Sequence, residues 1–177
     1  RQMCIRDSDK TFSSLLLYLI TQDNSVTLTN IVVREYAAPS GTNNSAAYTG
    51  TFGGATSVNN VYTFPTGTEA WAGFANENAG IYPLSFSKGG KIKFNGSTAG
   101  VDVSINFKFE FKPHPDTEPS FSTSNITISG TESTEYSVDI PIQDAANTFS
   151  SALMYLVTQD AGVTLTDFVI TSYLSLI

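Results

Sequence analysis

The stretch VDVSINFKFEF (residues 101–111) alternates apolar and polar side chains without a break. Its odd-numbered residues are Val, Ile or Phe, and its even-numbered residues are Asp, Ser, Asn, Lys and Glu. Because successive side chains of a strand point to opposite faces, this period of two predicts a strand with one buried and one solvated face. Such a strand is typical of an antiparallel sheet that covers a core on one side.

Nine further segments have the composition of short strands and are separated by turn signals such as Gly53-Gly54 and Asn59-Asn60. They are residues 49–53, 61–64, 70–75, 81–86, 91–95, 125–129, 136–140, 152–158 and 163–171. No window of helical length keeps a period of 3.6 residues. We therefore predict an all-β fold, a two-sheet antiparallel β-sandwich of the jelly-roll type.

The sequence also repeats itself. TFSSLLLYLITQDNSVTLTNIVV (residues 11–33) matches TFSSALMYLVTQDAGVTLTDFVI (residues 148–170) at 15 of 23 positions without a gap. The chain therefore contains at least two copies of one module. We predict that residues 9–36 are the last two strands of a truncated preceding module. Residues 37–47, rich in Pro, Gly, Asn and Ser, are predicted to be a linker, and residues 48–173 a complete β-sandwich module.

Both ends of the sequence resemble translated sequencing adapters. Residues 1–8 include MCIRDS, which resembles a reading of the transposase end used in library preparation, and residues 174–177 resemble part of its reverse complement. We interpret both ends as adapter scars on a metagenomic fragment, which do not belong to the fold. Without Arg1, Arg6 and Asp7 the net charge changes from −7 to −8, and the sole cysteine, Cys4, is lost as well.

Composition disfavours several classes of partner. Of the 177 residues, 41% are hydrophobic and only 14% are charged, with nine Lys and Arg in total. This acidic balance disfavours nucleic acid and anionic membrane surfaces, and no apolar run is long enough for membrane insertion as a helix. A module without cysteine has no disulfide framework and no thiol nucleophile. Because Thr, Ser, Asn and Gly supply the polarity, as in many secreted β-proteins, we expect a secreted or cell-surface (extracellular) protein.

The segment TEAWAGFANENAGIY (residues 68–82) is the first candidate for a ligand-binding surface. It holds the only Trp, and an apolar ring beside amides and carboxylates is what the binding of a sugar requires. The selected residues are Trp71, then Asn76, Glu77 and Asn78 at the end of the predicted strand, and Tyr82 at the start of the next. Two alternatives stay open, a core Trp with its N–H satisfied and a polar turn at residues 76–78.

The polar face of residues 101–111 is the second candidate. Asn106, Lys108 and Glu110 form a row that is able to bind sugar hydroxyls, and the alternative is a solvated face with cross-strand ion pairs. The only histidine, His114, lies in a loop with three prolines that lacks a metal-ligand spacing, which favours a rigid surface loop. No nucleophile elbow precedes a helix, so we predict that the module is not an enzyme.

Three segments of the module resemble jelly-roll carbohydrate-binding modules of the family four and nine type, within the galactose-binding-like superfold. IYPLSFSK (residues 81–88) resembles their strand of Tyr, any residue, Leu, Ser and Phe, and residues 101–111 resemble their central strand. VTLTDFVI (residues 163–170) resembles their final strand, in which an acidic residue precedes a small apolar run. The resemblance implies a non-catalytic module of an extracellular multidomain protein that binds polysaccharide, with adjacent copies of the module as further partners.

The same resemblance implies a structural calcium ion, which many such modules hold. Asp167 is the candidate side-chain ligand, because Ca²⁺ takes oxygen donors. The opening motif that helps to build that site, Asn or Asp before Phe and Glu, is not recognisable near residues 48–52, and the residue equivalent to Asp167 in the other copy is Asn30. The alternative is a solvated Asp at a strand end and no cofactor.

Two functions from different classes therefore stay open. The first is carbohydrate binding through an aromatic platform and polar side chains. The second is a structural or adhesive β-sandwich repeat of a large surface protein, with no ligand of its own. An exposed Trp71 beside polar side chains favours binding, and a buried Trp71 favours the structural repeat.

Overall fold

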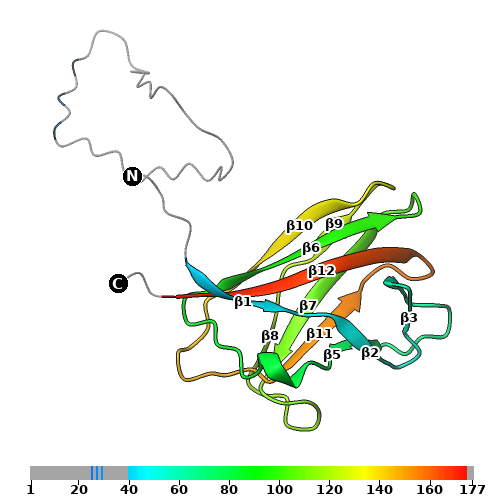
Figure 1. The fold of residues 1–177 in the computed structure, drawn as a ribbon, viewed down its shortest axis with the longest axis horizontal. Helices are drawn as coiled ribbons and strands as arrows, with labels where there is room; N and C mark the ends of the chain where they lie inside the picture. The colour runs from blue at the N-terminus through cyan, green and yellow to red at the C-terminus, as the bar shows by residue number, and fades with distance from the viewer. Residues whose placement is uncertain (1–24, 26, 28, 30–39, 175–177) are drawn as a thin grey trace. The chain divides into compact units, whose positions relative to one another are not determined.

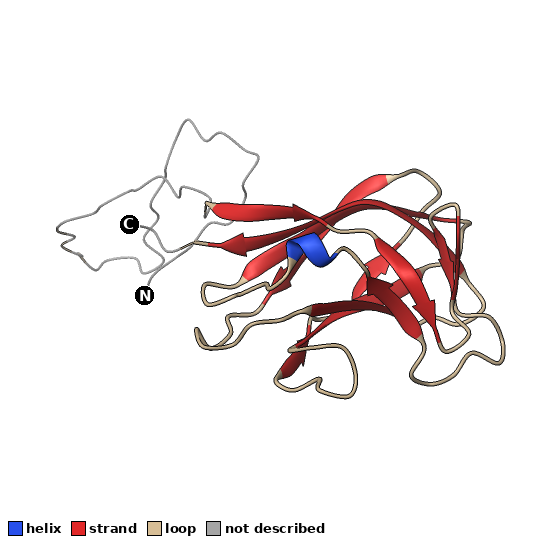
Figure 2. Cartoon of the chain, turned by 60° about the horizontal axis from the view of Figure 1, so that its bottom comes forward, coloured by secondary structure: helices blue, strands red, loops and turns tan. Residues whose placement is uncertain are grey.

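A computed structural model describes residues 25, 27, 29 and 40–174 of the chain (Figure 1). From residue 40 onward the chain forms two six-stranded sheets that pack face to face, as the turned view of Figure 2 shows. Every pairing between named strands is antiparallel. The predicted fold, an all-β, two-sheet antiparallel sandwich of the jelly-roll type, is confirmed. The predicted scar at residues 1–8 and the truncated module at 9–36, apart from residues 25, 27 and 29, lie outside the described residues, as do residues 175–177.

The first sheet is organised around the last strand of the chain. Its strands are β1 (Gly41–Ser45), β3 (Thr56–Val58), β4 (Val61–Thr63), β6 (Gly90–Thr98), β10 (Thr134–Ile140) and β12 (Gly162–Tyr173). The strand order is β10-β6-β12-β4-β3. β4 pairs with the first residues of β12 and β1 pairs with its last residues, while β6 pairs along most of its length.

The second sheet has the strand order β2-β5-β11-β7-β8, with β9 also paired to β7. Its strands are β2 (Tyr48–Phe52), β5 (Gly73–Asn76), β7 (Val103–Glu110), β8 (Ser120–Ser122), β9 (Ile126–Ile128) and β11 (Ser151–Leu156). The one helical turn of the described residues, the 3₁₀ helix η1 (Ala79–Ile81), follows β5. No helix in this described part is long and apolar enough to cross a membrane.

β7 is the strand on which the core is built. Its apolar face is completely buried, as the alternation predicts, and consists of Val103, Ile105, Phe107 and Phe109. The ring of Phe107 lies 5.6 Å from that of Tyr48 in its own sheet and 5.8 Å from that of Phe94 in the other sheet. Aromatic pairs at such separations add to the hydrophobic stabilisation that holds the two sheets together.

β12 contains an irregularity that decides which of its side chains enter the core. Val163 and Leu165 are buried, and strict alternation would next bury Asp167. Instead the register with β6 shifts between Thr166 and Val169, and Asp167 adopts φ 56°. This β-bulge turns the carboxylate outward and places Phe168 in the core, 4% exposed. Asp and Asn tolerate positive φ better than other residues with a Cβ, which explains why an Asp stands at this position.

Two predicted elements differ from the structure. Residues 41–45 of the predicted linker form β1, which pairs with the last five residues of the repeat's final strand at Val169–Tyr173. An edge strand that contributes mainly backbone hydrogen bonds needs no apolar alternation, so its polar composition resembles that of a linker. Residues 81–86 are not a strand. Pro83 has no N–H to donate, and only Leu84 pairs, in an isolated bridge with Phe149.

The strand predicted over residues 70–75 begins later than expected. Trp71 lies in a turn, and β5 starts at Gly73. Two three-residue strands, β3 and β8, were not predicted, because so few residues carry almost no periodicity.

The positive φ of Asp167 in the bulge leads to a prediction about the melting temperature of two variants. Asp167→Val should lower the melting temperature by about 3–8 °C, because a β-branched residue is strained at positive φ. Asp167→Asn, the residue of the other copy, should leave it unchanged. Thermal unfolding followed by circular dichroism measures both. Equal losses in the two variants would show that the carboxylate matters rather than the backbone conformation.

Candidate ligand-binding face

The outward side of the second sheet, here called the outer face, collects side chains from four neighbouring strands. The register places Ala75 of β5, Leu153 of β11 and Lys108 of β7 side by side in one row. In the next row, Tyr155 of β11 is opposite Asn106 of β7, and Phe52 of β2 is opposite Gly73 of β5. On β5, β7 and β11 these positions alternate with buried ones such as Phe74, Phe107 and Met154, so they point away from the core. On β2 the register with β5 shifts between Tyr48 and Gly50, and Phe52 lies beyond this shift.

Three aromatic residues, Phe52, Trp71 and Tyr155, form a cluster at one end of the outer face. Trp71 is 61% exposed, and its ring lies parallel to that of Phe52, with an interplanar angle of 4° and centroids 6.3 Å apart. Tyr155 meets Phe52 edge to face, also at 6.3 Å. The sequence-based alternative of a core Trp is therefore wrong, and Trp71 is a surface ring that lies parallel to a second ring.

Gly73 makes this aromatic cluster feasible. A Cβ at Gly73 would lie 2.6 Å from Cζ of Phe52 and 2.9 Å from Cε1 of Tyr155. The missing side chain of Gly73 leaves space above the backbone, and the rings of Phe52 and Tyr155 occupy that space. Any larger residue would displace the rings of Phe52 and Tyr155, and Phe52 is the ring that lies parallel to Trp71.

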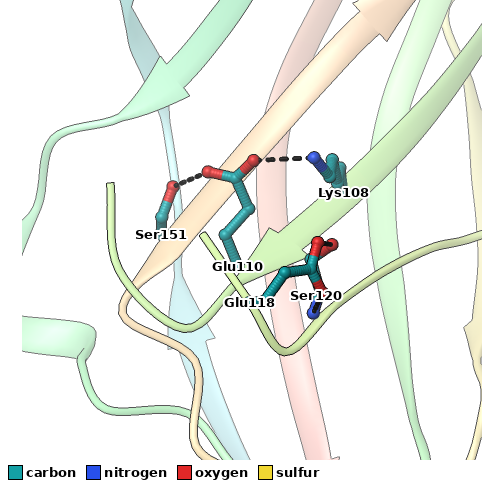
Figure 3. Close-up of polar contacts among 5 residues, drawn as sticks. All are labelled: Lys108, Glu110, Glu118, Ser120 and Ser151. Carbon is teal, nitrogen blue, oxygen red and sulfur yellow. Dashed lines mark hydrogen bonds and ion pairs between the residues drawn. The ribbon is translucent and has the colours of Figure 1, made fainter. Parts of the chain in front are cut away.

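The opposite part of the outer face is polar. Lys108 Nζ lies 2.8 Å from Oε1 of Glu110, and Ser151 Oγ donates to Oε2 of the same carboxylate at 3.2 Å (Figure 3). The side chain of Glu110 is only 6% exposed, whereas that of Lys108 is 30% exposed. The hydrogen bond with Glu110 raises the pKa of Lys108. Beside this pair, Glu118 accepts hydrogen bonds from the N–H and hydroxyl of Ser120.

Glu110 therefore holds Lys108 in place and neutralises its charge. The predicted polar row exists, since Asn106 also lies on this face, where its Nδ2 donates to Oδ1 of Asn125 at 3.0 Å. Asn106 and Lys108 are half-buried with polar atoms toward the outside, while Glu110 is covered. The exposed members of the row are the ones available to a ligand.

Removing the lysine alone should destabilise the module. Lys108→Met leaves a buried carboxylate with only Ser151 as a partner, and we expect a loss of roughly 1–3 kcal/mol in the free energy of unfolding. The double variant Lys108→Met/Glu110→Gln should recover most of this loss, because no buried charge is left unpaired. Urea denaturation measures both variants. If the double variant were no more stable than Lys108→Met alone, the loss would not come from the unpaired carboxylate of Glu110.

Hydrogen bonds stabilise the turn after β5, and they involve the side chains of Asn76, Asn78 and Tyr82. Nδ2 of Asn76 donates to the carbonyl of Ala47 at 2.6 Å, and its Oδ1 accepts from the N–H of Asn78 and from the hydroxyl of Tyr82. Asn78 Oδ1 accepts from the N–H of Gly80 and caps η1. The Tyr82 oxygen also accepts from the N–H of Ala152 in β11. Their predicted contribution to ligand binding has no support in this geometry, and the polar-turn alternative describes it better.

Glu77 has a different position from its two neighbours. It is exposed, and Oε2 accepts a hydrogen bond from the hydroxyl of Thr49 at 3.0 Å. A Cβ at Gly50 would lie 2.9 Å from the carboxyl carbon of Glu77, so this carboxylate covers Gly50 of β2. Of the residues proposed from the sequence, Trp71, Glu77, Asn106, Lys108 and Glu110 thus lie on or around the outer face, with Glu110 covered.

The buried tyrosines predict an alkaline limit of stability. Burial raises the pKa of Tyr82 to about 12 and that of Tyr48 well above its usual value. In the unfolded chain these phenols ionise near pH 10, so the folded state holds their protons more tightly. Their contribution to stability is complete below about pH 10 and is lost as the pH rises toward 12. In an alkaline titration, the final rise in tyrosinate absorbance should therefore coincide with the loss of the native circular dichroism signal. Ionisation of all tyrosines while that signal is still native would contradict the prediction.

The carboxylate of Asp167 is bonded to two neighbouring side chains, and its role as a calcium ligand stays a prediction. The carboxylate is fully exposed and accepts hydrogen bonds from Thr166 Oγ1 at 2.8 Å and from Asn95 Nδ2 at 2.9 Å, which lower the pKa of Asp167. Nowhere among residues 40–174 do three or more His, Cys, Asp or Glu side chains gather in an arrangement for a metal ion. The structure explains Asp167 through the bulge.

Phe52, Leu153 and Tyr155 lie on the outer face but were not selected from the sequence. Alternation alone does not tell which face of a strand is buried when both faces carry apolar residues, as in SALMYL.

Comparison with known proteins finds similarity only among solved structures. No protein-family model matches the sequence, and no curated protein matches it. CBM29_1, a family 29 carbohydrate-binding module from Piromyces equi, is 15% identical, with 75% of this chain and 91% of that chain covered and a TM-score of 0.47. The CBM22-1 xylan-binding domain of Xyn10C from Paenibacillus barcinonensis is 16% identical, with 78% and 100% covered and a TM-score of 0.48.

A variant of CBM29-2 complexed with cellulohexaose is 13% identical, with 76% and 81% covered and a TM-score of 0.43. TM-scores below 0.5 at such identities are too low to assign a function to this chain. Its function has to be inferred from the geometry of its own outer face.

Proposed function

We propose that the module formed by the described residues is a non-catalytic carbohydrate-binding module that binds polysaccharide on the outer face. The observation that carries this proposal is Trp71, an indole that is 61% exposed and lies parallel to the ring of Phe52. Leaving a large apolar ring in water forgoes the stabilisation that its burial would contribute. A flat ring held in one orientation is suited to stacking on the apolar face of a sugar ring.

The remaining residues of the outer face suit a chain of several sugars. Leu153 and Ala75 form an open apolar strip between Trp71 and the polar row, and this strip is part of a sheet surface rather than an enclosed cavity. Asn106 and Lys108 lie on one side of it and Glu77 lies near the other. Amide, ammonium and carboxylate groups around an apolar strip provide the donors and acceptors that sugar hydroxyls need.

The charges on the outer face favour a neutral polysaccharide. Among the residues named for the outer face, Lys108 is the one cation. Its Nζ lies 2.8 Å from Oε1 of Glu110, which neutralises its charge. The chain as a whole has a net charge of −7. An acidic polysaccharide would have to approach a negatively charged protein without a free cation to pair with, so glucans, mannans and xylans are better candidates than polyuronates.

A catalytic role has less support. Retaining and inverting glycosidases need two carboxyl groups free to act on one glycosidic bond. On the outer face, the carboxylate of Glu110 is buried and bonded to both Lys108 and Ser151. We propose that the module instead holds polysaccharide near other domains of an extracellular, multidomain protein.

The test uses Trp71 both as the ligand contact and as the reporter. As the only Trp, it makes intrinsic fluorescence specific to the outer face. We expect retardation of the module in gels that contain a neutral polysaccharide, with a change in Trp fluorescence, and a loss of affinity of at least about tenfold for Trp71→Ala. Ile142→Ala, an exposed apolar residue outside the outer face, is the matched control and should bind normally.

Each other outcome has a definite meaning. Full binding by Trp71→Ala would remove the aromatic cluster from the site. No retardation on glucans, mannans, xylans or polyuronates would instead favour the structural or adhesive repeat, with no ligand of its own. Stronger retardation on polyuronates than on neutral chains would contradict the charge argument.

A further inference from the structure

The first and last strands of the module begin and end at the same place. β1 and β12 are antiparallel neighbours, and Gly41, the first residue of β1, is the register partner of Tyr173, the last residue of β12. Directly opposed residues of such a pair have Cα atoms about 5 Å apart. Figure 1 shows the start of β1 beside the end of β12. The chain therefore enters and leaves the module at one end, here called the junction end.

The repeat shows how much chain connects two copies. At the same spacing that aligns residues 11–33 with 148–170, Tyr36 corresponds to Tyr173. Only Ala37, Ala38, Pro39 and Ser40 then separate the last residue of one copy from Gly41 of the next. Fully extended, this connection spans no more than about 18 Å.

We infer that consecutive copies are joined at their junction ends and diverge from there, instead of following one another end to end. An end-to-end array would require the chain to leave each module at the far end, about 40 Å away along the twelve residues of β12. The four-residue connection spans at most about 18 Å, which is too short to reach from the junction end of one module past the length of β12. The partner at the junction end is thus a second copy of this module, and this inference rests on the tandem arrangement predicted from the repeat.

The outer-face aromatic cluster lies toward the other end. Tyr155 is next to the last residue of β11, and the turn that follows leads into Gly162, the first residue of β12. The loop before Trp71 is held to this turn, since Thr66 Oγ1 donates to the carboxylate of Asp160 at 2.9 Å. Trp71 is therefore placed away from Gly41 and Tyr173, where the neighbouring copy is attached.

The sequence of the preceding copy has the same residues at two positions that lie on the outer face of this module. Leu153 and Tyr155 correspond to Leu16 and Tyr18, identical residues in the preceding copy. Two copies that are joined at their junction ends leave the opposite end of each module uncovered. The outer faces of both copies are then free to bind one polysaccharide chain. A connection of four residues, one of them Pro39, also keeps the effective concentration of the second module high.

The arrangement can be measured without any polysaccharide. The described module contains no cysteine, so a chain of two copies of residues 41–173 joined by residues 37–40 accepts spin labels at chosen sites. One pair replaces Lys88 in both copies, next to Gly89, whose carbonyl accepts from the N–H of Tyr173 at the junction end. The other pair replaces Ala99 in both copies, which follows Thr98, the register partner of Val163 at the far end.

We expect the Lys88→Cys pair to show a shorter and narrower distance distribution than the Ala99→Cys pair. The reverse order, or equal distances, would overturn the inference. A single copy with one label is the control and should show no dipolar coupling. Lengthening the connection by about twelve Gly and Ser residues should broaden the Lys88→Cys distribution.

Binding is then measured separately. The two-copy chain should bind a long neutral polysaccharide at least about tenfold more tightly than one copy does, and the lengthened connection should reduce this gain. If neither chain binds while the Lys88→Cys distances are short, the proposed function fails and the junction geometry stands. If both bind but the distances are reversed, the geometry fails and the proposed function stands.

Discussion

The β-bulge at Asp167 is the constraint on which the rest of the sandwich depends. By taking φ 56° this residue inserts one extra position into β12, so that Leu165 and Phe168 both face the core although three positions separate them. Phe168 then contacts aromatic rings from both sheets, which are those of Tyr48, Tyr62, Phe94 and Phe107. Without the bulge, a carboxylate would enter that aromatic core and Phe168 would face water, at a high cost in free energy.

The outer face is a consequence of how completely the core side is filled. Phe107 and Phe109 of β7 and Met154 of β11 are fully buried, and no polar residue interrupts them. Every intervening position is thereby directed outward in register, which aligns Asn106 with Tyr155 and Lys108 with Leu153. A ligand-binding surface on such a sheet is rigid because the backbone beneath it is fixed by the packing on its other side.

Much of the fold could be predicted from local sequence, and the reasons differ among elements. The strand at residues 101–111 was predicted because its apolar and polar positions alternate strictly, although only Val103–Glu110 is paired. β1 could not be predicted, because it is held by backbone pairing to a strand more than 120 residues away. Residues 81–86 resembled a strand by composition, but Pro83 prevents continuous pairing there.

The candidate site was predicted less completely than the fold. Trp71 was selected as the only indole, yet nothing local distinguished a buried ring from an exposed one. Asn76 and Tyr82 have the right chemistry for sugars, but their polar atoms bond within the module. Phe52 and Tyr155 gain their importance only from the edge-to-face contact that brings them together above Gly73.

By itself, the sequence determined the all-β class and the repeat, because both follow from the order of residues along the chain. Only the tertiary structure decided which face of the second sheet is open. It also decided that Glu110 is buried against Lys108 and that the first and last strands are neighbours. These features depend on pairing between residues far apart in the chain, and that pairing is set by the packing of the whole core rather than by any one segment.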